Sequence, residues 1–94
     1  MGGIEPNDKR LKWIADMEDV LKENMLAGEP IKKSRIPALY VRKYGASNLY
    51  RYRHPEGYRS SYTIIYREGI GVCPLIIDLI PHSEYEKLFG YGTT

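Results

Sequence analysis

Apolar residues are spaced as in a helix in the first half of the chain and as in strands in most of the second half. Residues 9–27 contain no helix breaker; Asn7 or Asp8 can cap the start of this segment, and Gly28 can end it. The apolar positions of the segment fall on one broad arc of a helical wheel: Leu11, Trp13, Ile14, Met17, Val20, Leu21, Met25 and Leu26. An arc of this width predicts a helix that covers a sheet, with the surplus apolar surface either buried in the core or kept for a partner.

Two shorter helices are predicted further along the chain. Pro37 suits the first position of a helix and Gly45 suits its end, which predicts a short helix between them. Ser83 and Glu86 have the spacing of a capping box, so a last helix should start there, with Gly90 as its stop.

Three strands are predicted between these two helices, separated by turn residues at 54–57 and 68–71. Pro74 falls inside the third strand, and because proline cannot donate to the ladder it predicts a bulge or an edge position. The predicted fold class is α+β, with two N-terminal helices packed on a three-stranded antiparallel meander and a short C-terminal helix. The predicted ranges are helices 9–27 and 38–44 and strands 49–53, 58–67 and 72–80.

The composition is that of a single small domain, 1–94. Its 94 residues are 43% hydrophobic and 28% charged, and a domain of this size has no room for a large interior cavity, so we expect no cofactor. No apolar run approaches the ~20 residues that cross a membrane, and the first residues lack the regions of a signal peptide, so we expect a cytoplasmic protein. Cys73 has no disulfide partner and no zinc-type spacing to His54 or His82, so no metal site is expected.

The net charge of +2 conceals an uneven distribution. Residues 32–59 hold eight bases and one acid, a net charge of +7, whereas the rest of the chain holds six bases and eleven acids, a net charge of −5. One strongly basic segment in a nearly neutral protein is typical of a chain that meets a polyanion with one face.

Five of the nine tyrosines lie in the same basic segment, and a tyrosine ring can stack on a nucleobase. The alternative is that the tyrosines fill a half-buried sheet and the bases only solvate a face. The candidate nucleic-acid-binding residues are Lys32, Lys33, Arg35, Arg42, Lys43, Tyr50 and Tyr52.

The last half of the chain resembles the RelE/ParE toxin superfamily. Residues 50–53, Tyr-Arg-Tyr-Arg, are similar to the family's aromatic-basic-apolar-basic strand, and residues 57–64, Gly-Tyr-Arg-Ser-Ser-Tyr-Thr-Ile, are similar to the strand that follows. His82 and Tyr85 have the His-x-x-Tyr spacing with which many prokaryotic members end. The helical half is similar only in its architecture.

Two features depart from the family pattern. Only residues 1–6 precede the first helix, so the strand with which family members begin is missing or vestigial. Ser60 and Ser61 stand where the family favours aliphatic residues, which lightens the core unless Ser61 faces the active cleft.

The resemblance implies a toxin of a type II toxin-antitoxin system, a RelE-like, metal-independent endoribonuclease that cleaves mRNA on the ribosome and is neutralised by a cognate antitoxin. A homodimer is also possible. The resemblance assigns Arg51, Arg53 and Arg59 to phosphate binding and transition-state stabilisation, for which the planar fork of arginine is suited. His82 is a candidate acid or base because an unperturbed histidine titrates near neutrality, and Tyr85 is a candidate orienting donor or stacking surface. Next to Pro81, His82 is alternatively a helix-entry residue.

The register of the first hairpin, where His54 is interpreted as a turn residue, is a test of this assignment. If Arg51 lies opposite Arg59, across a three-residue loop 54–56, the three arginines share one face of the sheet. A loop of two or four residues turns Arg59 to the other face.

Two other functions are compatible with the sequence. One is a non-catalytic module that binds RNA or DNA, because no residue is an unambiguous general base. The other is a ParE-type gyrase inhibitor that acts by protein contact, because a shared fold does not fix the function.

Overall fold

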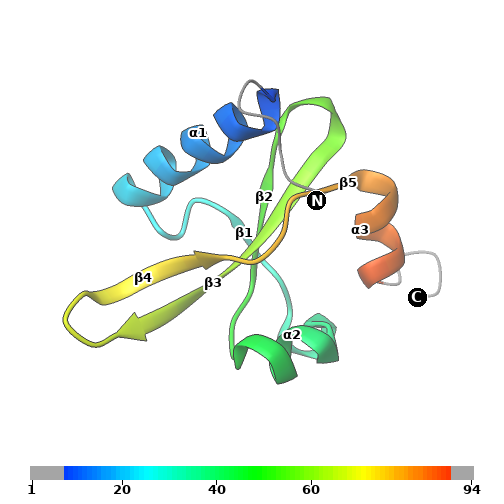
Figure 1. Ribbon diagram of the computed structural model, residues 1–94. Helices are drawn as coiled ribbons and strands as arrows, with labels where there is room; N and C mark the ends of the chain where they lie inside the picture. The colour runs from blue at the N-terminus through cyan, green and yellow to red at the C-terminus, as the bar shows by residue number, and fades with distance from the viewer. Residues whose placement is uncertain (1–7, 90–94) are drawn as a thin grey trace.

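The computed structural model describes residues 8–89 (Figure 1). Its helices are α1 (Lys9–Glu23), α2 (Ala38–Tyr44) and α3 (His82–Phe89), with short 3-10 turns at Lys33–Arg35 and Pro55–Gly57. Its strands are β1 (Glu29–Pro30), β2 (Tyr50–Arg53), β3 (Tyr58–Arg67), β4 (Gly71–Ile76) and β5 (Ile80–Pro81). The chain is thus α+β, as predicted, and the central β2–β3–β4 meander is antiparallel.

The sheet is larger than the predicted three strands. Its order is β1-β2-β3-β4, and β5 pairs with the first residues of β3. β1 and β5 are two residues long each, too short to leave an alternating pattern in the sequence. β1 nevertheless matters for the site described below, because it places Glu29 opposite Arg51.

Helix α1 starts as predicted and ends earlier than predicted. The Asp8 carboxylate accepts a hydrogen bond from the backbone N–H of Arg10 at 2.8 Å, which is an N-cap. The helix ends at Glu23 and not at residue 27, because the Asn24 side chain accepts from the Leu26 N–H at 3.0 Å and closes a local turn.

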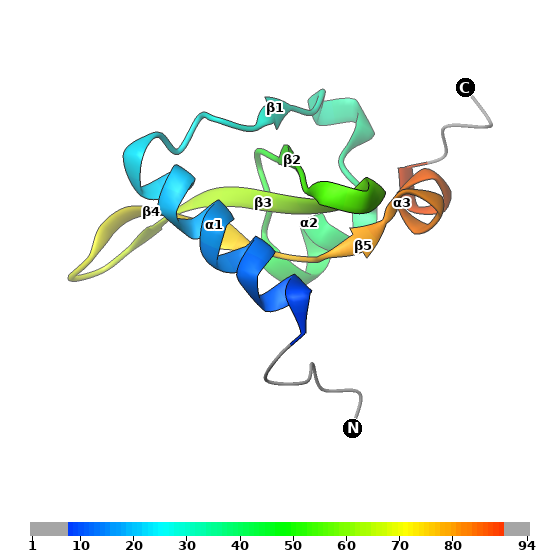
Figure 2. The ribbon, with the colours of Figure 1, turned by 90° about the horizontal axis from the view of Figure 1, so that it is seen from above.

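The two N-terminal helices cover opposite faces of the sheet (Figures 1 and 2). On one face, α1 buries Met17 and Leu21 against Tyr62 of β3. On the other face, Tyr40 of α2 forms a core with Tyr85 of α3 and its helical neighbours. The alternation of side chains along β3 separates these two cores, and it also decides which residues of β2 and β3 can meet at a functional site.

The broad apolar arc of α1 is only partly buried. Trp13, Met17 and Leu21 form its buried stripe, whereas Leu11 and Val20 are 40% and 38% exposed. The helix therefore covers the sheet with a narrower face than the sequence offers. That the remaining apolar surface serves a partner stays a prediction.

The third predicted strand is wrong in its extent, because residues 77–79 interrupt it. Tyr62 pairs with Ile76 and Arg59 pairs with Ile80, so three residues face two across this part of the sheet, which is a bulge. Asp78, in the bulge, accepts hydrogen bonds from the Ser61 N–H at 2.7 Å and from the Tyr40 hydroxyl. The carboxylate thus substitutes for a missing strand partner and ties α2 to the sheet.

Proline and glycine lie where their geometry fits, with one error at α3. Pro74 is in β4, which is at the edge of the described sheet, so the edge alternative is confirmed. Gly45 ends α2 with φ of 63°, as predicted. The predicted capping box is wrong, because α3 already begins at His82 and Ser83 lies inside its first turn. Gly90, the predicted stop, is outside the described residues.

Candidate functional site

The β2–β3 hairpin brings the three candidate arginines onto one face of the sheet. Arg53 lies directly opposite Arg59, and Arg51 lies opposite Ser61. The loop between the paired arginines, 54–58, therefore has five residues, two more than the three-residue alternative, with Glu56 and Gly57 both at positive φ. Arg59 thus lies opposite Arg53 and not opposite Arg51, but the loop length is odd, so the three arginines share one face, as the assignment requires.

Tyr85 supports this arginine cluster, Arg51, Arg53 and Arg59, from below. The guanidinium carbons of Arg51 and Arg59 each lie 5.7 Å from the centre of the Tyr85 ring, within cation–π range. The ring is fully buried and stacks on Phe89, with 4.3 Å between ring centres. Tyr85 has no exposed ring on which a nucleobase could stack, so in this structure it positions the arginines.

Glu29 is the residue of this site that sequence reasoning missed. Its Oε1 lies 2.9 Å from Nε and 2.7 Å from Nη2 of Arg51, and 3.2 Å from Nε of Arg53. Hydrogen bonds from Arg51 and then Arg53 lower the pKa of this carboxyl. The signal was weak, because Glu29 lies just outside the basic segment and on a strand of only two residues.

Arg59 differs from its two neighbours in its partners. Its Nη1 donates to the Gly57 carbonyl at 3.2 Å, and its Nε is buried without a hydrogen-bond partner among residues 8–89. Within the same residues no carboxylate lies within ion-pair distance of its guanidinium. A guanidinium has five N–H donors, so Arg59 retains the capacity to bind an anion.

His82 is the first residue of α3 and lies beside the turn of the hairpin. A Cβ added at Gly57 would be 4.0 Å from the His82 Cβ, which places His82 near the carbonyl that Arg59 contacts. The imidazole is about half exposed, and its Nε2 lies 3.0 Å from the Glu86 carboxylate. The Glu86 carboxylate, one turn further along α3, thus orients the imidazole.

The other predicted bases are all exposed. They lie on the segment that runs from β1 through the 3-10 turn and along α2: Lys32, Lys33, Arg35, Arg42 and Lys43. The Lys43 ammonium lies 5.6 Å from the centre of the Tyr44 ring. Each of these side chains is free to reach solvent, as phosphate-contacting residues must.

The two predicted tyrosines of β2 lie on the opposite face from the arginines, because side chains alternate along a strand. Tyr50 stacks on Tyr62, with 5.2 Å between ring centres, and both Tyr50 and Tyr52 pack against the core under α1. Neither ring lies on the arginine face, although Tyr52 lines a hollow together with Arg51 and Arg53. Their alternation with arginine in the sequence therefore reflects a two-faced strand.

Ser60 and Ser61 are both fully buried, one on each face. Ser60 Oγ lies 2.7 Å from Nε2 of His54, which is itself buried on the α1 face and stacked near Trp13. Ser61 is on the arginine face, but its hydroxyl is enclosed and has no hydrogen-bond partner among the described residues. His54 is thus a core residue as well as the residue that starts the turn, and burial lowers its pKa.

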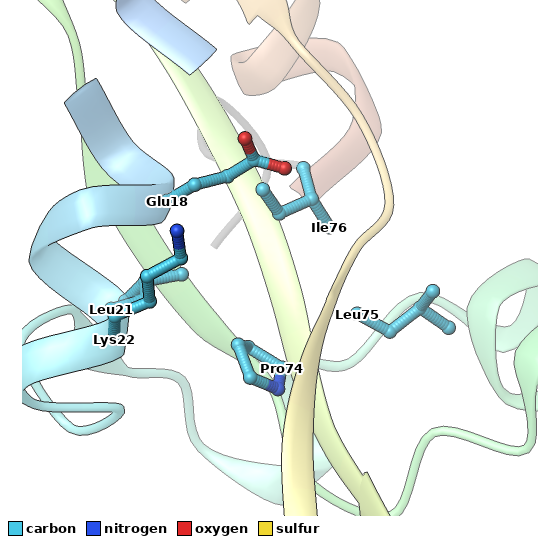
Figure 3. Close-up of a pocket in the computed structure, with 6 residues that line it drawn as sticks. All are labelled: Glu18, Leu21, Lys22, Pro74, Leu75 and Ile76. Carbon is cyan, nitrogen blue, oxygen red and sulfur yellow. The ribbon is translucent and has the colours of Figure 1, made fainter. Parts of the chain in front are cut away.

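Two surface hollows accompany these elements. The larger, of about 540 Å³, lies between α1 and β4 and is lined by Glu18, Leu21, Lys22, Pro74, Leu75 and Ile76 (Figure 3). It contains no member of the arginine cluster. The smaller, of about 270 Å³, is lined by Ala27, Gly28, Glu29, Arg51, Tyr52 and Arg53. We take the smaller one as the candidate site, because it is the one that adjoins the cationic face.

Within residues 8–89 no three His, Cys, Asp or Glu side chains gather closely enough to hold a metal ion. None of the described helices has the length and apolar character needed to cross a bilayer. Comparisons of the chain with protein-family models, with curated proteins and with solved structures find no match.

Proposed function

We propose that this chain binds RNA through the arginine cluster and acts as the toxin of a type II toxin-antitoxin system, cleaving mRNA on the ribosome without a metal. The observation that carries the proposal is the shared face of Arg51, Arg53 and Arg59, with Arg59 free of a carboxylate partner within residues 8–89. Three arginines on one face of a sheet repel one another, and such a grouping is expected where a polyanion binds.

The arginine cluster fits the charge changes of RNA cleavage. The 2′-oxygen loses its proton and attacks the phosphorus, the bond to the 5′-oxygen breaks, and that oxygen takes up a proton. The phosphorane formed on the way carries two negative charges, which guanidinium groups stabilise through charge-assisted hydrogen bonds. Arg59 is the member suited to this, since no carboxylate within residues 8–89 pairs with its guanidinium.

Proton transfer is assigned to the end of the site near the hairpin turn. His82, in contact with Glu86, is the candidate donor to the leaving 5′-oxygen. Among residues 8–89, Glu29 is the carboxylate that pairs with Arg51 and Arg53, but its lowered pKa makes it a weak base. In a RelE-like layout the meander followed by a C-terminal helix would carry the site, which agrees with the order β2, β3, β4 and α3.

Growth and mRNA cleavage on induced expression test the proposal. Wild-type chain should arrest growth in a permissive host and leave cut mRNAs, and Arg59→Ala should slow cleavage about 100-fold or more, as removal of a transition-state donor does elsewhere. Arg67→Ala is the matched control, because Arg67 is an exposed arginine at the far end of the same strand. Unimpaired growth with wild-type chain, at an expression level verified by blotting, contradicts the proposal.

A second candidate, RNA binding without cleavage, is favoured by the burial of Tyr85 and by the pairing of His82 with Glu86. It predicts Arg59-dependent binding and intact mRNA in the same experiment. A gyrase inhibitor would instead change plasmid supercoiling and leave RNA untouched.

Partners belong to the proposal as well. A cognate antitoxin would be expected to cover the arginine face, and the exposed Leu11 and Val20 of α1 offer a second contact for it or for another copy of the chain. A cytoplasmic location follows from a ribosomal substrate.

A further inference from the structure

The position of Glu29 in the arginine cluster is that of a phosphate oxygen. One atom, Oε1, is hydrogen-bonded to two nitrogens on the same edge of the Arg51 guanidinium and to Nε of Arg53. Arginines bind a phosphate oxygen with the same donors. A phosphate that contacts both Arg51 and Arg53 by these nitrogens must first displace Oε1.

The short strand and the exposed side chain of Glu29 allow such a displacement. β1 consists of Glu29 and Pro30 alone, and the Glu29 side chain is 53% exposed. The Arg53 side chain is 60% exposed, so solvent and ligands reach the pair from outside, beside the hollow that both residues line. The Glu29–Arg53 ion pair, exposed on both sides, contributes little to stability, whereas in the Glu29–Arg51 pair the Arg51 side chain is only 18% exposed.

The cross-strand pairing makes the contact specific. Glu29 is directly opposite Arg51 in the β1–β2 ladder, and Gly28 precedes it at a position where an added Cβ would be 2.8 Å from the Arg51 carbonyl oxygen. The Gly28 N–H is held by the Tyr62 hydroxyl at 3.0 Å. The backbone is therefore anchored on the residue before Glu29, while the carboxylate itself reaches across the exposed edge.

We propose that Glu29 is a built-in phosphate mimic that occupies the Arg51–Arg53 half of the site and competes with the RNA backbone for it. This inference rests on the proposed function for its ligand, a phosphodiester. It divides the cluster into an open half, Arg59, and a half that opens only when a phosphate displaces the carboxylate. Removal of the Glu29 charge should then strengthen RNA binding. If Glu29 merely oriented the arginines, removal of its charge would weaken RNA binding.

Fluorescence anisotropy with a labelled single-stranded RNA oligonucleotide tests the inference. We expect Glu29→Gln to lower the dissociation constant about five- to tenfold at low salt and to steepen the dependence of log K on log salt by about 0.7, the value for one more phosphate contact on a single strand. Glu56→Gln is the control: it removes the same charge from the neighbouring hairpin turn, where Glu56 pairs with Lys9. It should shift binding by less than about twofold. Thermal melting by circular dichroism verifies that both variants are folded.

The outcomes separate this inference from the proposed function. If wild-type chain binds RNA, Arg53→Ala weakens binding and Glu29→Gln fails to tighten it beyond Glu56→Gln, the inference is overturned and the proposed function stands. If wild-type chain and Glu29→Gln both fail to bind RNA, both are overturned. If only Glu29→Gln binds, or binds more tightly with the steeper slope, the inference is supported.

Discussion

The Asp78 bridge offers a direct test of how the bulge between β4 and β5 is held. Asp78 accepts one hydrogen bond from the Ser61 N–H and one from the Tyr40 hydroxyl, so it joins the sheet to α2 beneath the arginine face. Asp78→Ala removes both acceptors. The Ser61 N–H is then left in the interior without a partner, since its usual strand partner is displaced by the bulge.

The loss can be estimated from these two bonds. A hydrogen bond to a charged acceptor contributes about 1.5–3 kcal/mol, and a buried N–H without a partner costs about 1–3 kcal/mol. Desolvation partly offsets this gain, because burial raises the pKa of Asp78 and so penalises its ionised form. We therefore expect Asp78→Ala to lower the free energy of unfolding by about 2–4 kcal/mol, a large share of the ~5–14 kcal/mol of a domain this size.

Urea denaturation followed by circular dichroism measures this change. Two variants divide the effect. Tyr40→Phe removes only the hydroxyl donor to the carboxylate and should cost about 1.5–3 kcal/mol. Asp78→Asn keeps one acceptor for the Ser61 N–H and should cost less than alanine. A stability of Asp78→Ala within about 0.5 kcal/mol of wild type would refute the reasoning, because apolar packing alone would then hold the bulge.

Two further predictions concern residues near the site. Because burial lowers the pKa of His54 in the fold, protonation of His54 favours the unfolded chain. The free energy of unfolding should therefore be greatest above pH ~6.5, the pKa of histidine in the unfolded chain, and should fall as the pH drops below it. Urea midpoints at several pH values measure this fall, and an equally steep fall in His54→Gln would assign it to other groups. Gly28→Ala should lower the free energy of unfolding by about 1–3 kcal/mol, because its Cβ would be 2.8 Å from both the Arg51 carbonyl oxygen and the Tyr62 ring. An unchanged urea midpoint would show that the backbone at Gly28 can shift to make room for the methyl group.

Structural features that depend on contacts between residues close in the sequence could be predicted. The Asp8 cap, the glycine end of α2 and the whole of β3 follow from short-range geometry. The facing of the three arginines depends on the parity of the hairpin loop, which the sequence left open. Each depends on contacts within a few residues along the chain or across one turn, which periodicity and turn chemistry report.

Features that depend on distant contacts could not be predicted. The break at 77–79 exists because Asp78 finds Ser61 and Tyr40, and nothing in its neighbourhood in the sequence indicates this. Glu29 joins the arginines through a two-residue strand that has no pattern of its own. The burial of Tyr85 likewise depends on the packing of α3 under the sheet, which a His-x-x-Tyr spacing does not specify.

The central claim is that RNA phosphates bind at the arginine cluster and not to positive charge in general. Its most direct test is the salt dependence of RNA binding by wild-type chain, Arg59→Ala and Arg67→Ala, each of the two variants lacking one arginine of β3. The account predicts that Arg59→Ala reduces the slope of log K against log salt by about 0.7 and weakens binding, while Arg67→Ala leaves both near wild type. Equal losses in the two variants would contradict it.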